Sequence, residues 1–223
     1  MAIFGKLFGK VLYYPGCSSK YVNKDVQRSH EHLLTTFDID YIKLPELEVC
    51  CGLPALNLGY KDDFISLMNK NMKMFRNQRI KMIITSCPTC YATFKKHYPL
   101  EVKHITEVIL ENVEMLSKDY KNEDITFFDP CNNLKLEMLY DNPREILKNV
   151  GFNVVELPFN RRESLCCGFP LNENSPKIAN FMSQKILKDV KTKKMITTCP
   201  NCYMQLKKNS EGVEVLELSE VLI

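Results

Sequence analysis

The stretch Lys81–Tyr91 reads KMIITSCPTCY, and Lys194–Tyr203 reads KMITTCPNCY. In both stretches a run of apolar and β-branched residues leads into a Cys-Pro-x-Cys motif. Such a run predicts a buried strand. The proline predicts that a helix begins directly behind the first cysteine, because proline is favoured in the first helical turn. The chain therefore carries the same strand–cysteine–helix unit twice.

Two further segments repeat in the same order. Cys50–Pro54 (CCGLP) returns as Cys166–Pro170 (CCGFP), and Val11–Cys17 (VLYYPGC) corresponds to Ile125–Cys131 (ITFFDPC). Because matching positions are offset by similar amounts throughout, we interpret the chain as one ancestral half used twice. The ten cysteines then form two sets of five: Cys17, Cys50, Cys51, Cys87 and Cys90 in the first, and Cys131, Cys166, Cys167, Cys199 and Cys202 in the second.

Strand-like and helix-like patterns alternate within each half, which favours an α/β fold with parallel sheets and covering helices. We predict two pseudo-symmetric, Rossmann-like repeats at residues 11–120 and 121–223, packed as one compact unit, behind a lead-in of residues 1–10. The predicted strands are residues 11–14, 40–44, 81–86, 125–128, 153–157, 194–198 and 213–218. The predicted helices are residues 22–37, 62–79, 88–97, 143–150, 176–190 and 200–208.

Composition excludes several classes of function. The 223 residues are 45% apolar and 26% charged, and the net charge of +3 is too small to indicate nucleic acid. No apolar run reaches the length of a membrane span. Lys6 interrupts the N-terminal stretch, which therefore lacks the apolar centre of a signal peptide. Three roles are open for that stretch: it packs on its own domain, it docks a partner subunit, or it binds to a membrane surface. We expect a cytoplasmic protein without disulfides.

The cysteines are predicted to follow strand ends, where ligand sites of open α/β sheets gather. A zinc ion or a cubane iron–sulfur cluster takes four thiolates, whereas each half offers five. Adjacent residues of an extended chain also point to opposite sides, which makes a vicinal pair awkward for one centre. Each half therefore holds either a four-ligand cluster with a spare thiol or an unusual five-thiolate cluster. Ferredoxin spacing, Walker and GxGxxG motifs are absent, so electrons must come from elsewhere.

Two copies of Cys…Cys-Cys-Gly…Cys-Pro-x-Cys resemble the cysteine-rich CCG domain found in the B subunit of heterodisulfide reductase. The resemblance covers residues 11–218 and both motifs are complete. It implies that each set of five cysteines holds a noncubane [4Fe-4S] cluster and that the two clusters flank a bound disulfide. It also implies a thiol-disulfide reductase of an anaerobe's cytoplasm, in which the clusters themselves are catalytic. The implied electron donor is an iron–sulfur or flavin subunit, similar to the C or A subunits of that reductase.

Two other functions remain open from the sequence. The chain serves as a non-catalytic electron-transfer subunit of a lactate, glycerol-3-phosphate or succinate/fumarate dehydrogenase complex, or it is a zinc protein with one site made of Cys87, Cys90, Cys199 and Cys202. Lys20, Arg161 and Arg162 contact an anionic substrate or belong to the solvated surface. We assign no chemistry to Asp129 or to the four histidines: His30 and His32 lie on different helix faces, His97 ends a helix, and His104 has no visible partner.

Overall fold

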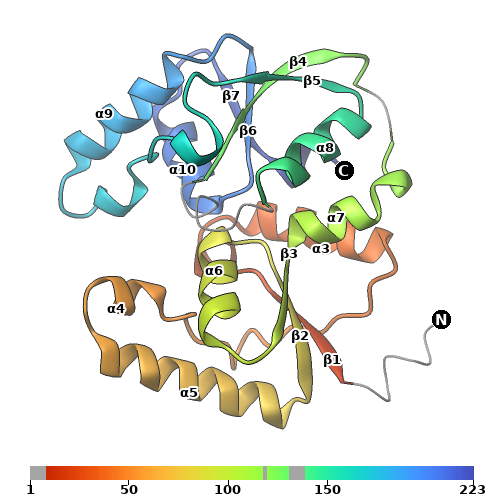
Figure 1. Ribbon diagram of the computed structural model, residues 1–223, viewed down its shortest axis with the longest axis vertical. Coiled ribbons are helices and arrows are strands. Elements are labelled where there is room, and N and C mark those ends of the chain that lie inside the picture. Colours follow the sequence, from red (N-terminus) through yellow and green to blue (C-terminus); the bar gives the residue numbers. More distant parts are fainter. Residues whose placement is uncertain (1–8, 118–119, 131–138) are drawn as a thin grey trace.

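The computed structural model describes residues 9–117, 120–130 and 139–223, and its strands form two parallel sheets. The first sheet has the order β1-β2-β3 and the second the order β5-β4-β6-β7. Figure 1 shows the first sheet in the lower half of the molecule and the second in the upper half. The predicted α/β fold of two Rossmann-like repeats is confirmed. The strands are β1 (Lys10–Tyr14), β2 (Ile80–Thr85), β3 (Glu101–His104), β4 (Glu123–Phe128), β5 (Phe152–Glu156), β6 (Lys194–Thr197) and β7 (Glu214–Glu217).

Every long helix that the apolar periodicity predicted is present, with ends displaced by a few residues. The α-helices are α2 (Cys17–Tyr21), α3 (Lys24–Thr36), α4 (Leu53–Asn57), α5 (Lys61–Asn77), α6 (Pro88–His97), α7 (Ile105–Glu111), α8 (Asp141–Asn149), α9 (Pro176–Leu187) and α10 (Pro200–Asn209). Short 3-10 turns are η1 (Val113–Met115), η4 (Arg161–Glu163), η5 (Phe169–Leu171) and η6 (Leu218–Val221). Among the described residues, no helix combines the length and apolarity needed to cross a bilayer.

One apolar core extends across both halves. Helices α3, α7 and α8 lie where the two sheets approach each other (Figure 1), and α7 contacts α8 directly. The core includes side chains from the first half (Tyr13, Leu33, Ile84, Ile109) together with side chains from the second (Phe127, Leu147, Ile196, Leu218). Burial of apolar side chains is the main stabilising term in folding, so the two halves stabilise each other. The division at residues 120 and 121 stays a prediction.

The structure departs from the predicted elements at two places. The expected strand at residues 40–44 is reduced to a single bridge between Ile42 and Leu12. Strand β3 and helix α7 were missed, although the structure shows that Glu101–Ile109 (EVKHITEVI) is the counterpart of Glu214–Leu222 (EVLELSEVL). In both halves this segment forms the strand beside the Cys-Pro-x-Cys strand and then a helical turn with a capping box.

Candidate functional site

Cys17, Cys87 and Cys199 follow the carboxyl ends of strands, as predicted, whereas Cys50 and Cys51 follow a segment that forms only a single bridge. Cys17 begins α2 just after β1, Cys87 is the N-cap of α6 after β2, and Cys199 is the N-cap of α10 after β6. Cys90 and Cys202 therefore lie in the first turn of a ten-residue helix, where free N–H groups and the helix dipole favour a negative charge.

The five thiols of the first set are in contact. Hydrogen-bonding contacts join Cys17 to Cys50, Cys50 to Cys51, Cys51 to Cys90, and Cys90 to Cys87. Cys17 is exposed, Cys50 is half-buried, and the other three are buried. The sulfur atoms thus lead from the surface into the interior at one end of the sheet.

Four thiols of the second set repeat this arrangement. Contacts join Cys166 to Cys167, Cys167 to Cys202, and Cys202 to Cys199. Cys131, the fifth member of this predicted set, lies outside the described residues. None of the nine described cysteines forms a disulfide. The neighbouring cysteines of each vicinal pair are in contact, so their side chains do not point to opposite sides of the chain.

Backbone N–H groups point at the same sulfurs in both halves. The N–H groups of Gly52 and Gly168 lie 3.4 Å from the Sγ atoms of Cys50 and Cys166. Both glycines have a positive φ, +95° and +89°, which lets the chain turn so that these donors face the thiols. Hydrogen bonds to sulfur are among the features that tune iron–sulfur clusters.

Contacts between the thiols lower the pKa of some cysteines and raise the pKa of others. Contacts with Cys50 and Cys90 hold the pKa of Cys51 well below its usual value, while contacts with Cys51 and Cys87 raise the pKa of Cys90 well above it. In the second set, contact with Cys202 lowers the pKa of Cys199, and contact with Cys166 raises the pKa of Cys167 to about 12. Several thiolates so close together repel one another, and only a shared cationic centre allows all of them to ionise.

The donor set fits an iron–sulfur cluster better than a lone ion. The zinc hypothesis joined Cys87 and Cys90 to Cys199 and Cys202, but each of these pairs contacts the vicinal pair of its own half. Within the described part of the chain, no three histidine, cysteine or acidic side chains surround one point as ligands of a single metal ion. Five thiols in contact exceed the four ligands of a structural zinc site, and cysteine thiolates are the usual ligands of iron–sulfur clusters.

The two cysteine groups lie close to each other. Ser18, next to Cys17, donates a hydrogen bond from Oγ to Oδ1 of Asn201, which stands between Cys199 and Cys202. Asn23 Nδ2 also donates to the carbonyl oxygen of Pro200, at 3.4 Å. The starts of α2 and α10 are therefore joined, and the first set is tied to the second through them.

Gly168 is expected to tolerate alanine less well than Gly52. The positive φ costs any L-residue about 1–2 kcal/mol at both positions. A Cβ on Gly168 would also lie 2.5 Å from the backbone oxygen of Ala179, whereas on Gly52 it would meet a side chain, the ring of Phe64, at 2.7 Å. Urea unfolding should show a larger loss of stability for Gly168→Ala than for Gly52→Ala. Equal losses of unfolding free energy in the two variants would contradict the expectation that a clash with backbone costs more than a clash with a side chain.

The basic residues that the sequence offered as substrate contacts already have partners. Lys20 donates a hydrogen bond to the carbonyl oxygen of Pro45, and its Nζ lies 3.8 Å from Glu48. Arg161 lies 3.3 Å from Asp141 and 3.6 Å from Glu156. Arg161 and Arg162 line a surface depression of about 410 Å³. We infer a structural role for Lys20 and Arg161.

A buried ion pair beside the second set was not predicted. The Arg144 guanidinium donates two hydrogen bonds of 2.8 Å to Asp129 and further bonds of 2.6 and 2.7 Å to Glu156. The Asp129 carboxylate also accepts the Arg161 backbone N–H at 2.7 Å, and its carbonyl accepts from Ser164 at 2.6 Å. These bonds tie the segment that ends at Pro130 to the loop before Cys166. The Asp-Pro-Cys sequence was the available signal for this anchor.

The histidines differ from expectation in one respect. His104 does have a partner: its Nδ1 lies 2.9 Å from Thr106 Oγ1, and its ring caps α7. His97 ends α6 as predicted and packs against Phe64. His30 is completely buried and lies 3.3 Å from Glu217.

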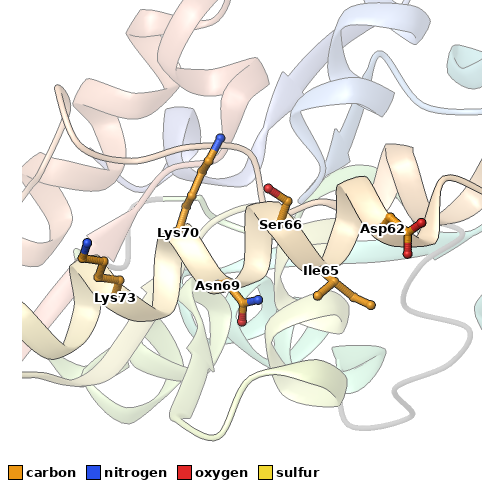
Figure 2. Close-up of a pocket in the computed structure, with 6 residues that line it drawn as sticks. All are labelled: Asp62, Ile65, Ser66, Asn69, Lys70 and Lys73. Atoms are coloured by element: carbon orange, nitrogen blue, oxygen red, sulfur yellow. The ribbon is translucent and has the colours of Figure 1, made fainter.

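One surface depression has no cysteine in its lining. It measures about 540 Å³ and is lined by Asp62, Ile65, Ser66, Asn69, Lys70 and Lys73. Figure 2 shows all six side chains on the single helix α5. Because one helix face lines it and none of the predicted ligands does, we assign it no function.

Comparison with known proteins agrees with the cysteine pattern. The chain is 30% identical over 206 residues to an uncharacterised iron–sulfur protein of Methanocaldococcus jannaschii, covering 89% of this chain and 41% of that protein. It is 28% identical to the B subunit of the CoM/CoB fumarate reductase of Methanothermobacter marburgensis, covering 96% and 46%. It is 21% identical to the D subunit of the dihydromethanophenazine:CoB–CoM heterodisulfide reductase of Methanosarcina acetivorans, covering 96% and 57%.

The chain thus spans less than half the length of the first two relatives. The model of the cysteine-rich CCG domain matches residues 11–95 and 125–207, and these ranges contain both cysteine motifs in full. The chain belongs to the cysteine-rich CCG domain family.

Proposed function

We propose that this chain holds two noncubane [4Fe-4S] clusters and reduces a thiol disulfide, such as a CoM/CoB-type heterodisulfide. Cys17, Cys50, Cys51, Cys87 and Cys90 would bind the first cluster. Cys131, Cys166, Cys167, Cys199 and Cys202 would bind the second. The observation that carries the proposal is the contact of the thiols in two groups, tied together through α2 and α10.

Reduction of one disulfide consumes two electrons and two protons and yields two thiols. Each of the two bound clusters would supply one of these two electrons. The chain itself fixes the thiolates at strand ends and helix N-termini and directs backbone N–H groups at them. The exposed Cys17 and the half-buried Cys50 and Cys166 mark the sides from which a small disulfide would approach.

The proposal includes a partner and a location. The chain matches no nucleotide- or flavin-binding motif, so its electrons would come from an iron–sulfur or flavin subunit, similar to the C or A subunits of heterodisulfide reductase. Relatives named as subunits of reductases support such a partner. The free thiols support the reducing cytoplasm as the location.

A second candidate function is electron transfer within a larger dehydrogenase or reductase complex, without a substrate of its own. The burial of Cys51, Cys87, Cys90, Cys167, Cys199 and Cys202 favours it. Buried sulfurs can hold a cluster that passes electrons without touching a substrate. The fumarate reductase relative is named as a subunit of such a complex.

Anaerobic purification with metal and sulfide analysis tests the proposal. Two four-iron clusters correspond to about eight iron atoms and about eight labile sulfides per chain. A colourless protein with one zinc and no sulfide would overturn it. A chemically reduced sample, mixed with a small heterodisulfide, should then release two thiols per disulfide. If the clusters are reduced and reoxidised without thiol release, the electron-transfer function holds instead.

A further inference from the structure

The strands beside the two Cys-Pro-x-Cys strands share their register and a capping box, but they carry different side chains at the cap position. Strand pairing places His104 beside Thr85 and Glu217 beside Thr197. Each threonine stands two residues before the first cysteine of Cys-Pro-x-Cys. His104 and Glu217 also occupy the same N-cap position of a capping box. The duplicated chain thus carries an imidazole beside the first group and a carboxylate beside the second.

Both side chains are completely buried, so their charge states follow from their partners. Burial and the nearby His30 charge lower the pKa of His104 to about 3, which leaves it neutral at pH 7. Burial opposes ionisation of Glu217, but the His30 charge and hydrogen bonds from Ser219 hold its pKa below the usual value. Its Oε2 accepts the Ser219 N–H at 2.8 Å. Glu217 is therefore ionised.

The third member of this cluster is His30 of α3, which stands between the two halves. Its Nε2 lies 3.3 Å from Glu217 Oε2, and its charge is also felt by His104. Glu217 lies on β7 beside β6, the strand that leads into Cys199. The carboxylate thus stands next to the strand of the second cysteine group, while its charge also acts on His104 and Tyr13 of the first half.

Orphaned polar atoms strengthen the effect of this pair. Within the described residues, Nδ1 of His30 and Oε1 of Glu217 are buried without a hydrogen-bond partner, whereas His30 Nε2 faces Glu217 Oε2 at 3.3 Å. The donors of Ser219 reach only Oε2 of this carboxylate, so its charge is compensated at one oxygen only, in a medium of low dielectric constant. A negative charge of this kind favours the state of a nearby cluster that carries less negative charge, which is its oxidised state.

We infer that the buried His30–Glu217 pair makes the two cluster sites unequal and holds the second cluster at a lower reduction potential than the first. This inference rests on the proposed function, since it requires both clusters. The first electron taken up by the chain then resides at the first site. An order of filling is useful in a two-electron reduction, because the donor meets one preferred acceptor.

Redox titration of the cluster-loaded protein, followed by electron paramagnetic resonance, tests the inference. Glu217→Gln keeps the size and the acceptor for Ser219 but removes the charge. We expect one of the two midpoint potentials to rise while the other stays in place. Comparison with Cys87→Ser/Cys90→Ser, which lacks the first cluster, assigns the moving signal to the second.

Two matched controls separate charge from structure. His104→Gln is a neutral exchange at the equivalent position, and Glu214→Gln removes an exposed carboxylate from the other end of β7; both should leave both potentials unchanged. Equal shifts of both signals, or no shift in Glu217→Gln with intact iron content, would overturn the inference. A wild-type protein without iron and sulfide would instead overturn the proposed function. If Glu217→Gln does not fold, Glu217→His, which copies the first half, replaces it.

Discussion

Cys87→Ser combined with Cys90→Ser is expected to remove one cluster and to abolish disulfide reduction. Both thiols are buried, and Cys90 is in contact with both Cys87 and Cys51. A hydroxyl is a poor ligand for iron in a thiolate site, so the first group would lose two ligands at once. Iron content should fall from about eight to about four atoms per chain, the content of one four-iron cluster. With one electron left for a two-electron couple, turnover should stop.

The same helix supplies the control for this experiment. Lys95→Ser with Lys96→Ser alters two exposed positions of α6 and leaves every thiol in place, so iron content and turnover should stay at the wild-type level. Cys199→Ser with Cys202→Ser should reproduce the loss in the second group. Disulfide reduction that persists in a protein with half the iron would disprove the cooperation of two clusters.

Arg144→Met is expected to be the most destabilising single exchange outside the cysteines. The Asp129 carboxylate is completely buried, and its two bonds from Arg144 supply its countercharge. Breaking a buried ion pair from one side costs about 3–5 kcal/mol, because an uncompensated charge remains. Urea or thermal unfolding monitored by circular dichroism measures the loss.

Removing the stranded charge should recover much of that stability. In Arg144→Met/Asp129→Asn the amide oxygen can still accept the Arg161 N–H, and no buried carboxylate lacks a cation. Glu156, with 34% of its side chain exposed, can be hydrated when Arg144 is gone. A double variant no more stable than Arg144→Met would show that packing of the arginine against Phe127, rather than its charge, was decisive.

The repeat and the strand ends were predictable because their signals are local. Apolar runs, helix-opening prolines and the spacing of cysteines each act within a few residues, and parallel sheets bring strand ends to one edge. These signals alone predict Cys87 and Cys199 at the starts of α6 and α10, where the structure has them. That Cys131 belongs with the second group remains a prediction.

Features set by tertiary packing were not predictable. Strand β3 is four residues long and three of them are charged or polar, so its pattern was too short to separate from a loop. The Arg144–Asp129 and His30–Glu217 pairs join residues 15 and 187 positions apart. Nothing in the neighbourhood of His30 along the chain indicates a carboxylate partner, since only the meeting of α3 with β7 creates one.

The core that runs through both sheets bears on how the duplication arose. Ile84 and Ile109 of the first half share one buried cluster with Phe127 and Leu218 of the second half. An ancestor with a single repeat would have exposed that surface to water, and a second copy is the partner with the matching shape. Such an ancestor is best understood as a symmetric homodimer. Only after fusion of the two genes were the copies free to diverge in sequence, and the exchange of histidine for glutamate at positions 104 and 217 became possible.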